Sequence, residues 1–233
     1  MGIAILFFGV SLPLVYLVVR AFDAGAGSMG DLLFRARNLE LLWNTLTLTA
    51  GVLCLSTFIA LPLAWLTTRT SMKGKRAWAL VGVLPLAIPS YLMAYAILAM
   101  GGNIGVIAQL TDSVFPRFQG YWGAVAILGL CNFPYLFFNL RASLLTLDPA
   151  LEDVAYSLGH THRQVLWHVT LPQLKPAFLS GGLLITLHVF SEFAAVSQMR
   201  YETLSYALYS QYMSGMNPSY GACIALMLIA VTA

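Results

Sequence analysis

Apolar segments long enough to cross a lipid bilayer recur along this chain and limit its fold more than any other feature. A helix needs about 20 apolar residues to cross a hydrocarbon core of about 30 Å. Only 9% of the 233 residues are charged, against about 25% in soluble domains, so the chain is expected to lie in a membrane. We predict an all-α transmembrane bundle with about six spans, at residues 3–19, 41–66, 78–100, 121–140, 177–197 and from 221 onward. The sixth is too short to cross the bilayer, so we expect the chain to be a fragment.

Two regions are predicted from the spacing of these segments. Residues 1–40 would hold an N-terminal span and an external link, and residues 41–233 would form the main transmembrane domain. A cleaved signal peptide is the alternative for the first span, because Ala24-Gly25-Ala26 resembles a cleavage site. No basic residues precede the apolar run, however, and that favours a retained helix.

The distribution of positive charge predicts the orientation. Arg69, Lys73, Lys75 and Arg76 lie in one short link that contains no acidic residue. Short basic links stay in the cytoplasm, so residues 67–77 and 142–175 are predicted to be cytoplasmic. Residues 101–120 and 199–220 would then be external, the first with a short re-entrant helix and the second rich in tyrosine.

Two prolines interrupt the third predicted span. Pro85 and Pro89 lie within L-P-L-A-I-P-S-Y, which predicts a bent or locally opened helix. Broken helices often line the substrate path of transporters, so both prolines are candidates for that path. A kink that serves only packing is the alternative.

The longest polar interruption, residues 148–172, is predicted to fold as two short helices joined at a glycine. Asp148 would cap the first helix and Gly159 would end it in a left-handed conformation. Thr161 and Gln164 have the spacing of a capping box for the second helix, which Leu171-Pro172 would close. We call residues 148–172 the elbow. It would present a docking surface to a partner, or lie on the membrane as an ordinary amphipathic hairpin.

The elbow resembles the EAA loop of type-I ATP-binding cassette (ABC) importer permeases. The matching positions are Glu152, Ala155, Gly159, Leu171 and Pro172, while Val154 stands where the family has its first alanine. The resemblance implies a type-I importer permease whose loop inserts into a cytoplasmic ATPase subunit. The implied coupling residues are Glu152, Asp153, Ala155, Gly159, Leu171 and Pro172.

Glu192 lies in the fifth predicted span. A carboxylate in an apolar span is costly unless it is paired or faces water, so Glu192 is either a functional group or a structural hydrogen-bonding group. Glu192-Phe193 and the later R-Y-E-T at 200–203 resemble the ferric-iron permease group, while thiamine, sulfate and molybdate permeases share a related acidic-Phe pair. Glu192, Tyr201 and Glu202 could offer the hard oxygen donors that a ferric ion prefers. Interfacial tyrosines need no such role, and no firm metal site is predicted.

The chain lacks a G-x-x-x-x-G-K-[ST] loop and any evident nucleophile–base pair, so we expect a permease subunit rather than an enzyme. No cofactor is expected in the chain itself. The resemblance implies ATP and Mg on partner ATPase subunits, a periplasmic binding protein, a second permease half, fused or separate, and a bacterial inner membrane. The net charge of +3 gives no reason to expect nucleic acid. A secondary transporter or channel is the alternative class, and cysteines 54, 131 and 223 are predicted to be buried packing residues.

Overall fold

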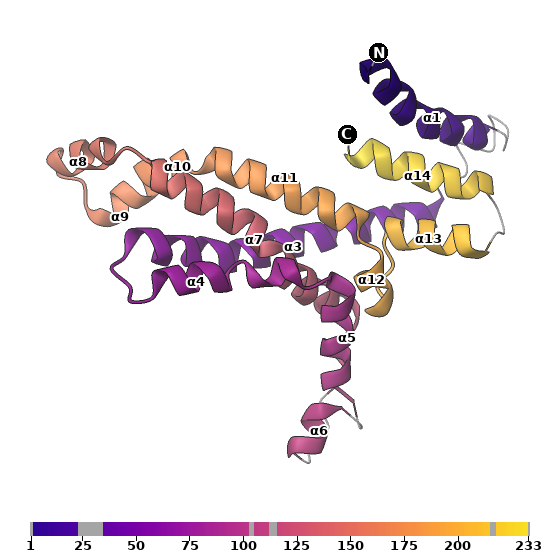
Figure 1. Ribbon diagram of the computed structural model, residues 1–233, viewed down its shortest axis with the longest axis horizontal. Helices are drawn as coiled ribbons and strands as arrows, with labels where there is room; N and C mark the ends of the chain where they lie inside the picture. The colour runs from indigo at the N-terminus through magenta and orange to yellow at the C-terminus, as the bar shows by residue number, and fades with distance from the viewer. Residues whose placement is uncertain (1, 23–34, 103–104, 112–115, 215–217, 233) are drawn as a thin grey trace.

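Three long helices form the centre of the molecule (Figure 1). The computed structural model describes residues 2–22, 35–102, 105–111, 116–214 and 218–232, and in these ranges it contains helices and no strands. Helix α3 (Ala36–Arg69) packs along α7 (Gly120–Thr146), and α11 (Lys175–Ser191) packs on both. The core between them is made of aliphatic and aromatic side chains such as Phe137, Leu136 and Leu48.

Small residues let these helices approach closely. A Cβ atom added at Gly129 of α7 would lie 2.6 Å from the Leu55 side chain of α3, and one at Gly181 would lie 2.8 Å from Leu136. Ala60 and Ala64 of α3 are completely buried. Association of helices in lipid depends on such close packing, because lipid tails are as apolar as leucine.

Within the described ranges, two helices, α3 and α7, are long and apolar enough to cross a membrane as single elements. Two bent helix pairs bring the number to four if each pair is counted as one span. Helix α1 (Gly2–Phe22) packs against α14 (Pro218–Thr232), and their described apolar parts are shorter. The expected all-α bundle is therefore confirmed, and the described helices are roughly consistent with the predicted number of about six spans. The link predicted over 21–40 is partly helical, since α3 begins at Ala36, while residues 23–34 lie outside the described ranges.

The third predicted span is two helices at nearly a right angle. Helix α4 (Lys75–Val81) and the 3₁₀ helix η1 (Leu84–Ala87) run back along α3, and α5 (Ser90–Met100) then turns by 94°. Ile88 and Pro89 have extended backbone at the break. The prolines thus predicted the position of the break, and residues 78–100 form a bent helix pair rather than one continuous helix.

The fifth predicted span, 177–197, is also interrupted. Helix α11 ends at Ser191, Glu192 has an extended backbone, and the short α12 (Ala194–Gln198) follows. The tyrosine-rich segment predicted as external then forms helix α13 (Leu204–Ser214), because Leu204 packs with Leu41 and Ile224. A short helix, α6 (Val106–Thr111), lies within 101–120 as predicted.

The elbow lies at one end of the bundle, at the left of Figure 1. Helix α8 (Pro149–Ser157) is followed by α9 (His162–Val165), the π-helical turn η2 (Leu166–Thr170) and α10 (Leu171–Gln173). The last helix of the elbow ends at Gln173, one residue after the Leu171-Pro172 pair that was predicted to close it. Leu171 N–H bonds to the Leu166 carbonyl five residues back, and this wider turn lets the helix continue through Pro172. The chain bends by 55° only between Gln173 and Lys175.

One prediction about the cysteines is also wrong. Cys131 and Cys223 are buried, but Cys54 is exposed on α3. A bundle in lipid can present apolar side chains outward, so an apolar span does not by itself imply burial within the protein.

Candidate functional site

Local hydrogen bonds fold the elbow as its sequence predicts. The Asp148 carboxylate accepts a hydrogen bond from Ala150 N–H at 3.0 Å and caps α8. Gly159 has φ +86°, and the bonds from Gly159 N–H to Tyr156 O and from His160 N–H to Ala155 O form a Schellman motif. Thr161 and Gln164 make both bonds of a capping box. The elbow is therefore a defined structure rather than a flexible link.

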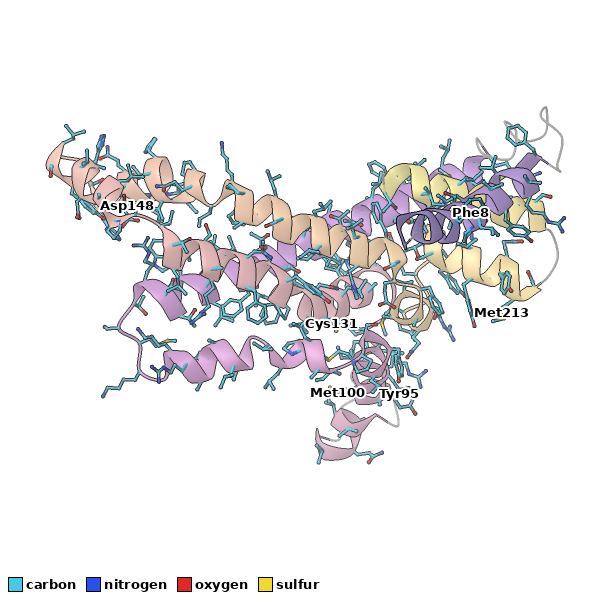
Figure 2. All side chains as sticks on the ribbon, turned by 45° about the horizontal axis from the view of Figure 1, so that its top comes forward. Phe8, Tyr95, Met100, Cys131, Asp148 and Met213 are labelled. Atoms are coloured by element: carbon cyan, nitrogen blue, oxygen red, sulfur yellow. The ribbon has the colours of Figure 1, made fainter. Side chains whose placement is uncertain are left out.

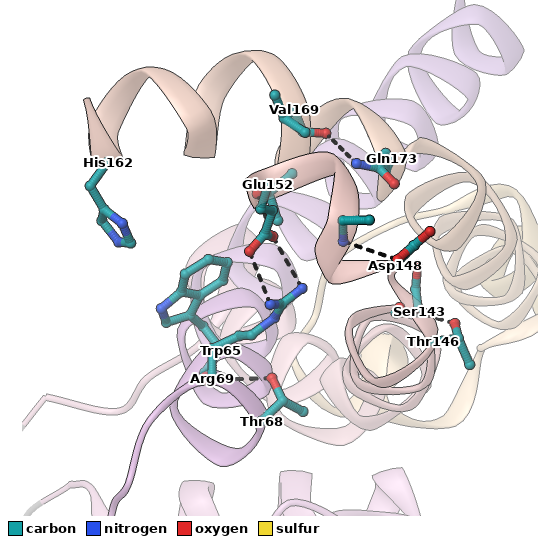
Figure 3. A network of polar contacts seen from close by, with 12 residues as sticks. Trp65, Thr68, Arg69, Ser143, Thr146, Asp148, Glu152, His162, Val169 and Gln173 are labelled. Atoms are coloured by element: carbon teal, nitrogen blue, oxygen red, sulfur yellow. Dashed lines mark hydrogen bonds and ion pairs between the residues drawn. The ribbon is translucent and has the colours of Figure 1, made fainter. Parts of the chain in front are cut away.

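Glu152 fastens the elbow to the end of α3 (Figure 3). Its two carboxylate oxygens each lie 3.2 Å from a terminal nitrogen of Arg69. Thr170 Oγ1 donates a further hydrogen bond of 3.0 Å to Glu152 Oε1. The side chains of Arg69 and Glu152 are only 22% and 18% exposed, so solvent screens this ion pair less than a surface pair.

The elbow also has an outward apolar face. Ala155 is buried within the elbow, where α8 contacts α9 and η2, but Leu151, Val154 and Leu158 are 51%, 58% and 74% exposed. These three recur at helical spacing on one side of α8, while Asp153 and Ser157 occupy its polar side. Leu171 packs against the main core, and Pro172 is exposed. The predicted coupling residues thus have different places: Glu152 forms the ion pair and Gly159 the turn, Ala155 and Leu171 are packed inside, and Asp153 and Pro172 are exposed.

A cavity of about 360 Å³ lies between the elbow and the end of α3. Trp65, Arg69, Glu152, Tyr156 and His162 are among the residues that line it. Tyr156 Oη lies 2.6 Å from His162 Nδ1, and the two rings are stacked, which joins α8 to α9. His160 and His168 are exposed.

Glu192 joins the two helix breaks inside the bundle. Ser90 Oγ, at the start of α5, donates a 2.7 Å hydrogen bond to Glu192 Oε2, and Ala195 N–H donates to Oε1 at 3.0 Å. Ser205 Oγ of α13 donates to the Glu192 carbonyl at 2.7 Å. The Glu192 side chain is 9% exposed, and His188 Nε2 lies 4.0 Å away. We call Ser90, Glu192, Ala195 and Ser205 the junction.

The remaining candidates for the substrate path do not all meet at this junction. Pro89 directly precedes Ser90, whereas Pro85 lies in η1. Tyr201 packs on α3, where its hydroxyl donates to the Asn44 carbonyl at 3.3 Å. Glu202 forms an ion pair with Arg37 at the start of α3. Among the described residues, no group of three or more His, Cys, Asp or Glu side chains could hold a metal ion.

Three residues that hold Glu152 or Glu192 in place were not predicted from the sequence. Arg69 was read only as a sign of orientation, and neither Thr170 nor Ser90 was singled out. Their partners lie 83, 18 and 102 residues away in the chain. Arg69 alone carried a signal that could have been used, because an acidic residue in the elbow needs a basic partner when it is removed from water.

The sequence profile of the family described as binding-protein-dependent transport system inner membrane component matches residues 56–233. The chain belongs to this family. The permease is 34% identical, over 94% of its length, to the Fe(3+)-transport system permease protein FbpB 2 of Haemophilus influenzae. It spans only 41% of that protein's length.

Two other proteins are similar to the permease. The molybdenum transport system permease protein ModB of Escherichia coli is 31% identical over 66% of this chain and 69% of its own. The structure of a bacterial alginate ABC transporter, in complex with an alginate-bound periplasmic protein, contains a chain that matches 98% of the permease. That match covers 87% of the other chain, with a TM-score of 0.77 and 18% identity. The permease therefore has the type-I ABC importer permease fold.

Proposed function

We propose that this permease forms the substrate pathway of a bacterial ABC importer and that its elbow docks on a cytoplasmic ATP-binding subunit. The exposed apolar face of α8 carries the proposal. Leu151, Val154 and Leu158 project from a helix that is capped, ended by a Schellman motif and anchored through Glu152. A rigid helix with an uncovered apolar side suits insertion into a groove of a partner.

In this proposal, movement of the ATPase reaches the membrane helices by two routes. The Glu152–Arg69 ion pair connects α8 to α3, and the continuous α9–η2–α10 helix leads into α11. Helix α11 ends at the junction, where Glu192 holds α5. The ATPase must contact the elbow differently in its open and closed states for this movement to switch access. ATP and Mg would bind the partner, and residues 67–77 and 142–175 would face the cytoplasm of the inner membrane.

Ferric iron is the proposed substrate, delivered by a periplasmic binding protein. The support is the 34% identity to the Haemophilus ferric permease, together with the Glu192-Phe193 and R-Y-E-T segments. Molybdate is the second candidate because of the similarity to ModB, and sulfate and thiamine follow from the related acidic-Phe pair. Iron would pass as cargo, so the proposal needs no resident metal site.

Replacement of Leu158 by aspartate tests the docking. Leu158→Asp places a charge on the apolar face of α8, and we expect it to abolish copurification of the ATP-binding subunit. Ser157→Asp, on the polar side of the same helix, is the matched control and should retain the subunit. Retention of the ATPase by Leu158→Asp, with normal transport, would contradict the proposal.

Uptake by the assembled transporter tests the substrate. Proteoliposomes that contain the permease, its ATPase and its binding protein should accumulate radioactive ferric iron in an ATP-dependent manner. Accumulation of molybdate, sulfate or thiamine instead of iron would replace the substrate but leave the permease assignment intact. A transporter that works without any ATPase would support the alternative class of secondary transporter or channel.

A further inference from the structure

A row of polar side chains follows the contact between α7 and α11. Ser180 Oγ of α11 donates a hydrogen bond of 2.9 Å to Asn139 Oδ1 of α7. Further along α11, the centroid of the His188 ring lies 5.9 Å from that of the Tyr135 ring. We call Tyr135, Asn139, Ser180 and His188 the seam. All four are at least partly exposed, so the seam lies on the outside of the contact between the two helices.

The seam lies at the depth of the hydrocarbon core. In the proposed orientation α11 begins at the cytoplasmic surface, so His188, near its other end, lies about 20 Å from that surface. In Figure 2, Cys131, one turn before Tyr135 on α7, lies between Asp148 of the elbow and Met213 near the opposite end. The hydrocarbon core is about 30 Å thick, so the seam is within it.

His188 is open on one side. Its side chain is 43% exposed in the structure. Ionisable side chains within a span almost always face the bundle interior or a water-filled cavity, because lipid tails offer no hydrogen-bond partner. The open side of His188 is therefore expected to face water or polar groups. In an importer, the water-filled space at this depth is the substrate pathway.

The acceptor groups beside the seam are already occupied. Both carboxylate oxygens of Glu192 accept hydrogen bonds at the junction, and this side chain is only 9% exposed. Asn139 Oδ1 accepts the bond from Ser180. Helices α7 and α11 contain no Asp or Glu. A bare ferric ion prefers hard, negatively charged oxygen ligands, and the seam has no such ligand free.

The groups of the seam that remain free can donate hydrogen bonds. In the described ranges the Tyr135 hydroxyl makes no hydrogen bond. His188 Nε2 lies 4.0 Å from Glu192 Oε2, which is too far for one. A phenol O–H and an imidazole N–H both donate to oxygen, and such bonds are strongest when the oxygen is anionic. These donors suit an oxyanion such as molybdate, or ferric iron enclosed in a chelate with a net negative charge.

We infer that the seam is the part of the pathway that contacts the cargo, that the cargo passes it as an anion, and that His188 determines this selectivity. This assignment rests on the proposed function, because it places the seam in the pathway of an importer. An anionic cargo also agrees with the similarity of the permease to both a ferric and a molybdenum permease, since either cargo would present anionic oxygens to the seam.

Thiol labelling tests whether the seam faces water. His188→Cys is introduced after Cys54→Ala, and the protein is assembled with its ATPase and binding protein in proteoliposomes. The probe is 2-sulfonatoethyl methanethiosulfonate, an anion that does not cross lipid. Thr186→Cys, about 200° away around the same helix, is the matched control. We expect His188→Cys to react several-fold faster than Thr186→Cys during transport. Equal rates, or no reaction at position 188, in an active transporter would overturn the role of the seam alone.

Transport by His188 variants tests contact with the cargo. His188→Leu removes the donor and should lower the transport rate several-fold, while the melting temperature and the copurified ATPase stay at the wild-type level. His188→Gln keeps an N–H donor and should recover most of the rate. Thr186→Val, off the seam, should transport normally. Normal transport by His188→Leu, or an equal loss of rate and melting temperature in both His188 variants, would overturn the role of His188.

Doubly labelled cargo tests the charge. Proteoliposomes receive either radioactive molybdate or radioactive ferric iron complexed with carbon-labelled citrate. We expect ATP-dependent entry of molybdate, or of iron together with the citrate label. Entry of iron without the citrate label would overturn the anionic form of the cargo and leave the proposed function intact. Uptake that continues at the full rate without any ATPase subunit would overturn the proposed function, and the assignment of the seam with it.

Discussion

Gly159 shows how one residue sets the geometry of the elbow. Its φ is +86°, and a Cβ atom added there would have no neighbour within 4 Å. A larger side chain would therefore fit at position 159. The left-handed backbone conformation is what requires glycine there. That conformation costs an ordinary L-residue about 1–2 kcal/mol, and it is what directs α9 back toward α3.

Replacement of Gly159 by valine should uncouple ATP hydrolysis from transport. The strain would shift the angle between α8 and α9 while the membrane helices remain intact, so membrane insertion should be normal. We expect transport per ATP hydrolysed to fall several-fold in proteoliposomes. Gly159→Asn is the control, since asparagine tolerates this conformation and should stay close to wild type. Normal coupling in Gly159→Val would refute the role of the turn.

The Glu152–Arg69 pair can be tested by a double-mutant cycle. Glu152→Gln or Arg69→Gln leaves a mostly buried charge without its partner, which should lower the free energy of unfolding by about 1–3 kcal/mol. The double variant should lose less than the sum of the two. Unfolding in detergent micelles measures these free energies.

Arg37→Gln, in the more exposed pair at the other end of α3, is the control. It should lower the free energy of unfolding by less than about 1 kcal/mol. If the losses of unfolding free energy in the Glu152 and Arg69 variants simply add in the double variant, the two residues do not interact.

Distance along the chain separates the residues that could be predicted from those that could not. Asp148, Gly159 and the Thr161–Gln164 box act through bonds to residues two to five positions away, so their spacing is sufficient to predict them. The partners of Glu152 and Glu192 depend on how whole helices pack. That packing cannot be predicted from a single sequence.

Among the elements, the interrupted helices are the most informative. The break after η1 and the break after α11 meet because Glu192 accepts bonds from Ser90 and from Ala195. Both acceptor oxygens of this carboxylate are therefore used in holding α5 and α12 together. This arrangement supports a positioning role for Glu192, as a carboxylate that joins two broken spans.

Variants of Glu192 distinguish a positioning residue from a substrate ligand. Glu192→Ala removes both acceptors and should lower the melting temperature and transport together, because Ser90 and Ala195 N–H lose their partner. Glu192→Gln keeps one acceptor and should lie between Ala and wild type in both measurements. A Glu192→Gln protein with normal stability but no transport would instead indicate direct contact with the substrate.

Two features of the elements could not be predicted from the sequence. The prolines predicted an opened helix, but not its 94° turn, because the angle depends on contacts with α7 and α12. The tyrosines of residues 199–220 predicted an external segment but not the helix α13, whose Leu204 packs with Leu41 of α3 and Ile224 of α14. Apolar length alone predicted the positions of α3 and α7 well.

At the scale of the whole molecule, α3 links the two ends of the permease. Its 34 residues correspond to about 51 Å, more than the hydrocarbon core of about 30 Å. Arg37 at one end binds Glu202, and Arg69 at the other binds Glu152 of the elbow. A motion of the elbow would therefore act on a single helix that reaches the opposite side of the membrane.

The most direct test of this account is crosslinking from Leu158→Cys in the assembled transporter. The exposed Cys54 is first replaced by alanine. Membrane-impermeant maleimide should label Leu158→Cys in inverted vesicles stripped of the ATPase and fail to label it in sealed right-side-out vesicles. With the ATPase present, a short thiol crosslinker should join Leu158→Cys to the ATP-binding subunit. Labelling from the outside, or no crosslink to an ATPase in an active transporter, would contradict the account.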